Sequence, residues 1–338
     1  MFPSLNTIIN RPTTISGSWP LLLFIENRSI YFIILKMMNR YNNKSSIFLL
    51  GFVLVSLGLL VFYISKNKHN ESIKYALLIG GGLCEIDNYN TFYNNIEYAA
   101  NSLTQLGYDD SNVKILFYGG RSPEYPLIEG DATRCNVIVE LGNYERIIDQ
   151  NDTLLIFRAG HGSIELVDEN YGILSNVNKV PMNENTNIIG TVAVMSFPDG
   201  PLSYIDFQEL LGRLKALQII VILSQCYSGQ FAEITTKLTN TVVVSETEEV
   251  GIAFSTNRRV KIWNHEVWPF VKCIFDGFLL GGCCESKPSV LTAFEYMLSC
   301  NPNVEGISIK ADRPLVKETP QIKYGKRLTK GAVYISRP

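Results

Sequence analysis

The chain has 338 residues, of which 46% are hydrophobic and 18% charged, with 30 basic residues against 32 acidic ones. This hydrophobic content excludes an intrinsically disordered chain. A formal net charge of −2 excludes binding to nucleic acid by bulk electrostatics.

The first long apolar segment is Ser46–Ile64, nineteen residues without a charge. At about 1.5 Å per residue, a helix of this length crosses most of a hydrocarbon core of roughly 30 Å, so we predict a single transmembrane anchor. A cleaved signal peptide is the alternative, although the flank Ser65–Lys68 is charged and no A-x-A-like cleavage site follows. Residues 1–45 are either an upstream extension of the reading frame or a cytoplasmic tail, and residues 65–74 form a short stalk.

The orientation of this anchor does not follow from charge, because basic residues flank residues 46–64 on both sides. If translation starts at Met37, only a short basic tail precedes the anchor. That arrangement favours a single-pass membrane protein whose following domain is extracytoplasmic or lumenal. Asn70-Glu71-Ser72 would then be available for glycosylation.

Residues 75–338 have the pattern of one α/β domain. Short apolar runs typical of buried strands alternate with segments of helical spacing, and this order predicts a parallel sheet covered on both faces. The expected strands are Tyr75–Gly80, Val113–Phe117, a run from Asp152, Gln218–Ser224 and Thr241–Ser245. The expected helices are Thr91–Leu106, Arg134–Ile148, Tyr204–Leu214, Asn264–Leu280 and Val290–Leu298. A polar insertion, Glu165–Pro201, contains alternating residues at Ile188–Ser196 that indicate a hairpin.

A nucleotide-binding alternative arises at Gly80–Gly82, because a glycine loop after a first strand is typical of dinucleotide-binding folds. The third glycine of that motif is missing here, where Glu85 stands instead. We therefore expect no nucleotide cofactor.

Two of the predicted strands end next to residues that can carry chemistry. The run Gln218–Ser224 leads to Cys226, and the run from Asp152 leads to His161, which has glycines on both sides. Taken singly, a cysteine after a core strand is usually a small buried hydrophobe, and a lone histidine is usually solvated or capping. Catalytic groups in parallel sheets lie beyond the carboxyl ends of the strands. If the two strands are neighbours, a thiol and an imidazole meet at one edge, as a thiolate–imidazole pair requires.

The segments Ser224–Gly229 and Ala159–Gly162 resemble the caspase–legumain clan of cysteine peptidases, over the chain from about Tyr75 onward. The form Cys-x-Ser-Gly is similar to legumain-like and metacaspase-like members and differs from the Gln-Ala-Cys-x-Gly of true caspases. The separation of His161 from Cys226 is longer than in most relatives, which implies an insertion. The resemblance implies a three-layer caspase-like fold, an α/β architecture with a mostly parallel sheet of about six strands flanked by helices. The predicted N-terminal transmembrane helix would precede it.

The same resemblance implies a cysteine endopeptidase that cleaves a protein or peptide substrate with a His–Cys dyad, through a thioester acyl-enzyme. Cys226 would be the nucleophile and His161 the general acid–base, while the backbone N–H groups of Gly162 and Cys226 would bind the oxyanion. Two alternatives stay open. A legumain-like transamidase or ligase would use the same dyad, and a non-catalytic binding module would keep the fold alone.

Substrate preference is predicted from the stretches Cys84–Asn90 and Ser245–Ser255, which match the pocket-forming loops of relatives. Their candidate substrate-binding residues are Glu85, Asp87, Ser245 and Glu246. An acidic lining would favour a basic side chain before the scissile bond. The alternative is that these carboxylates are merely solvated turn residues.

The remaining cysteines number six, an even set that permits disulfides outside the cytosol but does not fix their pairing. The chain contains no C-x-x-C pair and no H-x-x-x-H, so we expect no zinc site. It also lacks a D-x-D-x-D-G loop for calcium. No metal and no cofactor is therefore predicted.

Overall fold

The computed structural model divides the chain into two compact units, residues 1–71 and residues 72–338. The second unit begins three residues before the predicted domain start at Tyr75. The structure describes residue 51 and residues 55–59, 72–88, 90–123, 126–168, 172–174, 188–249, 260–262, 265–280, 289–304, 318–330 and 332–335.

In the first unit, Gly51 and residues 55–59 are described, and all of them are helical. No helix within the described ranges is long and apolar enough to cross a membrane. Most of the predicted anchor, residues 46–64, lies outside the described residues, as do residues 1–45. The anchor and its orientation therefore stay predictions.

A mostly parallel sheet of seven strands lies at the centre of the second unit, in the order β13-β10-β9-β4-β1-β2-β3. Every neighbouring pair is parallel except β13, which runs antiparallel to β10. The strands are β1 (Lys74–Gly81), β2 (Val113–Phe117), β3 (Gly130–Asp131), β4 (Thr153–Gly160), β9 (Gln218–Ser224), β10 (Thr241–Ser245) and β13 (Gln321–Tyr324). The predicted α/β class and parallel sheet are confirmed. The sheet has seven strands against the expected six or so, and its two short edge strands, β3 and β13, were not among the apolar runs identified from sequence.

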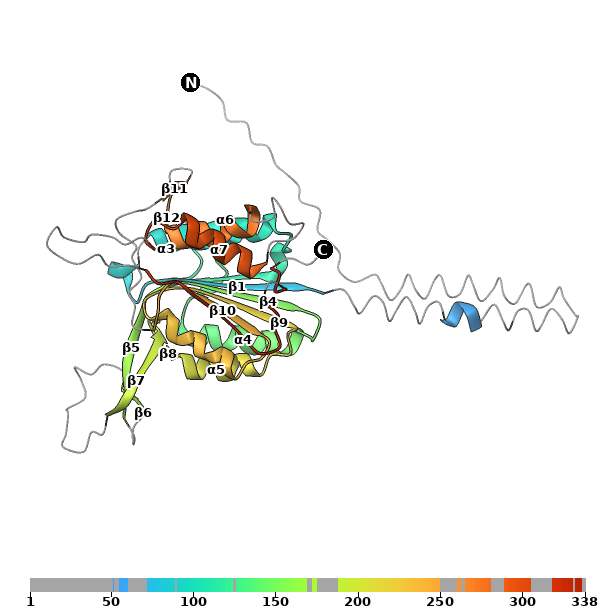
Figure 1. Cartoon of the computed structure of the whole chain (residues 1–338), viewed down its shortest axis with the longest axis horizontal. Helices are drawn as coiled ribbons and strands as arrows, with labels where there is room; N and C mark the ends of the chain where they lie inside the picture. The colour runs from blue at the N-terminus through green and yellow to red at the C-terminus, as the bar shows by residue number, and fades with distance from the viewer. Residues whose placement is uncertain are drawn as a thin grey trace, which may run out of the picture. The chain divides into compact units, whose positions relative to one another are not determined.

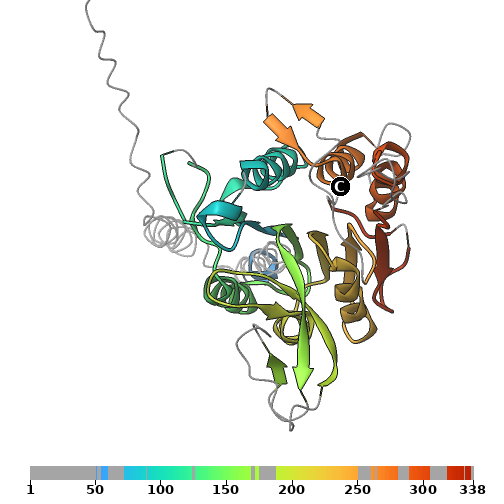
Figure 2. The same cartoon turned by 90° about the vertical axis from the view of Figure 1, so that its left-hand side faces the viewer.

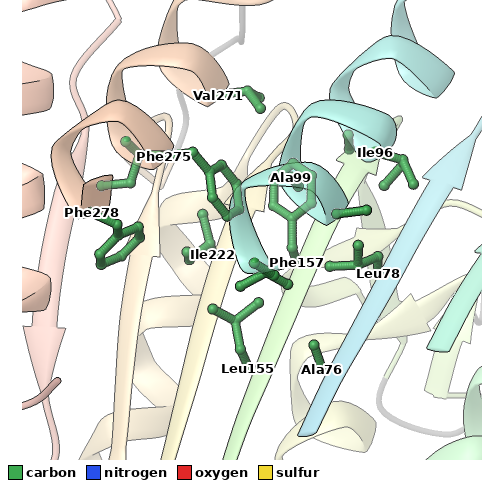
Figure 3. Close-up of a cluster of buried hydrophobic side chains, with 14 of the residues drawn as sticks. Ala76, Leu78, Ile96, Ala99, Leu155, Phe157, Ile222, Val271, Phe275 and Phe278 are labelled. Atoms are coloured by element: carbon green, nitrogen blue, oxygen red, sulfur yellow. The ribbon is translucent and has the colours of Figure 1, made fainter. Parts of the chain in front are cut away.

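Helices cover both faces of this sheet (Figure 1). On one face lie α3 (Asn90–Gln105), α6 (Pro269–Leu280) and α7 (Val290–Cys300), and on the other lie α4 (Arg134–Ile147), α5 (Tyr204–Gly212) and the 3-10 helix η3 (Ser228–Thr236). Strand β4 shows why two cores form, because its side chains alternate between them. Phe157 packs edge-on against Phe275 in the first core (Figure 3), at a ring-centroid distance of 5.3 Å. Ile156 belongs to the second core.

The insertion after His161 forms a second, antiparallel sheet in the order β6-β5-β7-β8. Its strands are β5 (Gly162–Asp168), β6 (Gly172–Leu174), β7 (Ile188–Met195) and β8 (Leu202–Ser203). The alternating segment Ile188–Ser196 belongs to an antiparallel pairing, as the predicted hairpin requires. That segment is one strand, and its long antiparallel partner is β5, which begins directly after His161.

The helix predicted from Asn264 begins later, at Pro269. Residues His265–Val267 form β12 instead, which pairs antiparallel with β11 (Val260–Ile262) in a small two-stranded sheet (Figure 2). Proline suits the first turn of a helix because its missing N–H would have no partner there. Pro269 thus marks the start of α6, which the apolar periodicity alone placed too early.

Candidate active site

The strands that lead to His161 and Cys226 are neighbours in the central sheet. β4 and β9 pair in parallel, and their last paired residues are Ala159 and Ser224. His161 and Cys226 each follow two residues later, so they stand at equivalent positions beyond the same carboxyl edge, which faces the viewer in Figure 2. The predicted pairing of His161 with Cys226 required these two strands to be neighbours, and they are.

Cys226 lies in a sharp turn between β9 and η3. The residue after it, Tyr227, has a φ of 56°, a left-handed backbone conformation that is uncommon for a residue with a large side chain. Such conformations cost of order 1 kcal/mol and persist where the surrounding structure enforces them, which is frequent at active sites. The turn leaves Cys226 partly exposed at the edge of the sheet.

Two further residues of the Cys-x-Ser-Gly motif hold this turn in place. The backbone N–H of Ser228 donates to Thr247 Oγ1 at 3.1 Å, and the Thr247 N–H donates to Ser228 Oγ at 3.2 Å. A side chain at Gly229 would place its Cβ 2.3 Å from the carbonyl carbon of Glu248. Ser228 and Gly229 therefore pack the turn against the segment that follows β10. The buried Ser228 hydroxyl is a structural group.

The imidazole of His161 is oriented by a backbone carbonyl. Nε2 lies 3.3 Å from the carbonyl oxygen of Asp87. Because a carbonyl can only accept, Nε2 is the donor, and Nδ1 is the nitrogen that remains for proton transfer. The ring also packs edge-on against Phe92, at a centroid distance of 5.2 Å, and Phe92 packs in turn against Trp268.

The turn that supplies this carbonyl is built by its own side chain. Asp87 Oδ1 accepts from the backbone N–H groups of Leu83 at 2.7 Å and Cys84 at 2.8 Å. Asp87, predicted to contribute its carboxylate, thus contributes its backbone carbonyl to the orientation of His161. No residue-type signal could have found it, since every residue carries a carbonyl.

Gly162 has its backbone N–H directed away from its neighbouring strand. The Ser196 N–H donates to the His161 carbonyl at 3.1 Å, which makes Gly162 and Met195 a non-hydrogen-bonded pair of the β5–β7 ladder. In such a pair the N–H points outward, where a substrate oxygen could accept from it. A Cβ at Gly162 would lie 2.2 Å from the carbonyl oxygen of Cys226, so no side chain fits between the two.

Gly162→Ala should therefore impair the site by displacing the backbone at residue 162. We expect turnover to fall about 10- to 100-fold, because the N–H donor is displaced from its place, and the unfolding free energy to fall by about 1–3 kcal/mol through overpacking. Gly142→Ala in α4, where an added Cβ meets nothing within 4 Å, is the matched control. It should leave turnover unchanged and stabilise the helix by about 0.5–1 kcal/mol. Equal turnover in the two variants would contradict the role of Gly162.

The predicted substrate-binding residues separate into two pairs. Glu85 is exposed, and it lies with Asp87 in the turn that contacts His161. Ser245 and Glu246 are fully buried at the end of β10, where the Ser245 hydroxyl donates to the Thr247 carbonyl at 3.0 Å. The first pair is placed at the rim of the site, whereas the second pair is enclosed behind it.

Glu246 belongs to a buried polar cluster next to the end of β9. It accepts a hydrogen bond from Ser224 Oγ at 2.7 Å. Burial, followed by the nearby carboxyl of Glu318, raises the pKa of Glu246 well above its usual value, which favours the neutral acid. Glu318 itself accepts from the side-chain amides of Asn301 at 3.0 Å and Asn303 at 2.8 Å. A neutral, enclosed carboxyl does not attract a basic substrate side chain, so the interpretation of Glu246 as part of an acidic lining gains no support.

This cluster predicts a pH dependence of stability. Because the pKa of Glu246 is higher in the folded chain than in the unfolded one, its contribution is full below about pH 4.5 and is lost as the pH rises toward the folded-state value. Glu246→Gln mimics the neutral acid and should remove this loss, at up to about 1.4 kcal/mol per pH unit for one proton. Chemical denaturation of both proteins from pH 4 to pH 9 is the measurement. If the unfolding free energies of the two proteins change with pH in the same way, the pKa of Glu246 is not raised in the folded chain.

Comparisons with known proteins identify no family for this chain. The sequence matches no family model and no curated protein. The solved structure of protein GSU0716 from Geobacter sulfurreducens is similar over 78% of this chain and 99% of that chain, with 12% identity and a TM-score of 0.45. A likeness at this level carries no argument about activity.

Proposed function

We propose that the chain is a cysteine endopeptidase similar to the caspase–legumain clan, with Cys226 as nucleophile and His161 as general acid–base. The observation that supports it most is the parallel pairing of β4 with β9, which brings both residues to one edge of the sheet. A three-layer caspase-like fold and a membrane anchor at residues 46–64 belong to the same proposal.

The first chemical step would be attack of the Cys226 sulfur on the scissile carbonyl carbon. The thiolate is the reactive form, and free cysteine is only partly ionised near neutral pH, so a neighbouring base has to take the proton. His161 is the candidate base, and because Nε2 donates to the Asp87 carbonyl, the proton would be taken by Nδ1. Cys226 is partly exposed at the sheet edge, where a peptide substrate would approach it.

Negative charge would then build on the substrate carbonyl oxygen. The outward N–H of Gly162 and the N–H of Cys226 belong to backbone segments in close contact, because a Cβ added at Gly162 would lie 2.2 Å from the Cys226 carbonyl oxygen. Two such donors, fixed before the reaction, stabilise the oxyanion without reorganisation. The imidazolium of His161 returns its proton to the leaving amine. Water, activated by the same imidazole, hydrolyses the thioester and releases the acid product.

The test is direct. The protein is incubated with a library of short peptides and with a peptide carrying an electrophile that traps thiolates. We expect cleavage products whose masses correspond to addition of water, and a covalent adduct that mass spectrometry maps to Cys226. The library also reports the residue preferred before the scissile bond. Absence of both cleavage and adduct would refute the proposal in favour of a non-catalytic module.

A further inference from the structure

A buried arginine lies behind the catalytic edge. Arg158 is near the carboxyl end of β4, and only 1% of its surface is exposed. Its side chain lies on the face of the sheet that carries α4 and α5, where its guanidinium carbon stands 4.5 Å from the ring centroid of Phe197. The aromatic contact of His161, Phe92, belongs to the opposite face.

The charge of Arg158 has no acidic counterpart among the residues that the structure describes. Within the part of the chain that the structure describes, no carboxylate forms an ion pair with it, and its Nε and Nη1 atoms have no hydrogen-bond partner. Burial lowers the pKa of Arg158 to about 9, so the group stays charged at neutral pH. A buried charge without a partner destabilises a fold. Stability therefore does not account for an arginine at this position.

One hydrogen-bonded path leads from this guanidinium to the catalytic histidine. Arg158 Nη2 donates to the Ser196 carbonyl at 2.8 Å, and the Ser196 N–H donates to the His161 carbonyl at 3.1 Å. The His161 carbonyl shares its peptide unit with the Gly162 N–H. Whatever fixes the plane of that peptide therefore also fixes the direction of the proposed oxyanion donor.

The guanidinium is also close to the catalytic edge in space. A Cβ on Gly160 would lie 2.6 Å from the Arg158 guanidinium carbon, so the charged group packs against the residue just before His161. Next to it, the side chain of Gln225 packs against Gly162 and is 1% exposed, with both of its polar atoms unpartnered. A guanidinium with two unpartnered nitrogens and an unpartnered carboxamide thus pack against the glycines that flank the histidine. Buried polar groups without hydrogen-bond partners are expected where function, not stability, selects the residue.

We propose that Arg158 is a positioning residue for the catalytic edge: through Ser196 it holds the His161–Gly162 peptide, and its charge favours the oxyanion that forms beside the Gly162 N–H. This inference rests on the proposed peptidase function. A full positive charge in a water-excluded region acts more strongly on a developing negative charge than it would in solvent. Its effect should therefore appear in the transition state and not in substrate binding.

Three variants test the proposal. Arg158→Met removes the charge and keeps an apolar stem, Arg158→Lys keeps a charge and a donor, and Arg213→Met removes an exposed arginine as the matched control. We expect Arg158→Met to lower kcat about 10- to 100-fold with KM changed less than about threefold. Arg158→Lys should recover most of this loss, and Arg213→Met should have no effect. The thermal midpoint of Arg158→Met should equal or exceed that of the wild type, because an unpaired buried charge has been removed.

A second readout does not depend on proteolysis. Alkylation of Cys226 by iodoacetamide, followed by mass spectrometry across a pH series, reports how readily the thiolate forms. In Arg158→Met this profile should move to higher pH. Wild-type kcat together with an unchanged profile, or a methionine variant that is unfolded or clearly less stable, would overturn the proposal. A wild-type protein that cleaves no peptide would refute the peptidase function itself, which is a distinguishable result.

Discussion

Cys226→Ala is expected to abolish peptide cleavage and labelling by a thiol-directed peptide probe, because alanine has no atom that can form the thioester. The fold should survive the change. Cys226 is partly exposed in a turn, and the neighbouring Ser228–Thr247 hydrogen bonds do not involve its side chain. We therefore expect circular dichroism spectra and a thermal midpoint close to those of the wild type, while activity falls to the background rate.

Two other cysteines serve as matched controls for this experiment. Cys84 and Cys135 are exposed free thiols, so each is accessible to the same probe. Cys84→Ala and Cys135→Ala should retain full cleavage. Loss of activity in either control, with cleavage preserved in Cys226→Ala, would assign the nucleophile to a different cysteine.

The central strands could be predicted from sequence because they are buried on both faces. Short, mostly apolar runs identified Val113–Phe117 and Thr241–Ser245 with their observed bounds. Strand β13, by contrast, is four half-buried residues at the sheet edge, where pairing with β10 and not hydrophobicity determines the conformation. β12 was not predicted because its three residues, His265–Val267, lie just before α6 and were assigned to that helix.

Some groups of the candidate site could likewise be predicted from the sequence, and others could not. Cys226 and His161 could be found because side chains at strand ends leave a signal in the sequence. The Asp87 carbonyl and the outward Gly162 N–H could not, because backbone groups acquire their roles only from register and turn geometry. Arg158 did leave a signal. A single charge inside the otherwise apolar run Thr153–Gly160 breaks the pattern of a doubly buried strand.

His161→Ala should lower the turnover of amide substrates by about a hundred- to ten-thousand-fold, the usual effect of removing a positioned proton-transfer group. His161→Gln is the sharper variant. The glutamine carboxamide N–H can still donate to the Asp87 carbonyl, as His161 Nε2 does in the wild type. The carboxamide cannot, however, exchange a proton at neutral pH. Both variants should therefore be similarly inactive. His265→Ala, in β12, is the control and should keep near-normal turnover.

The choice of substrate separates the two roles assigned to His161. An amide releases an amine that must be protonated as it leaves, whereas an activated ester releases a group that needs no proton. If His161 acts as general acid, its loss should slow amide cleavage by at least about tenfold more than cleavage of an activated ester with the same acyl group. If both substrates are slowed equally, the imidazole serves to generate the thiolate alone. Near-normal turnover of the amide in His161→Gln would show that hydrogen bonding to the Asp87 carbonyl, and not proton transfer, is what the site requires of this residue.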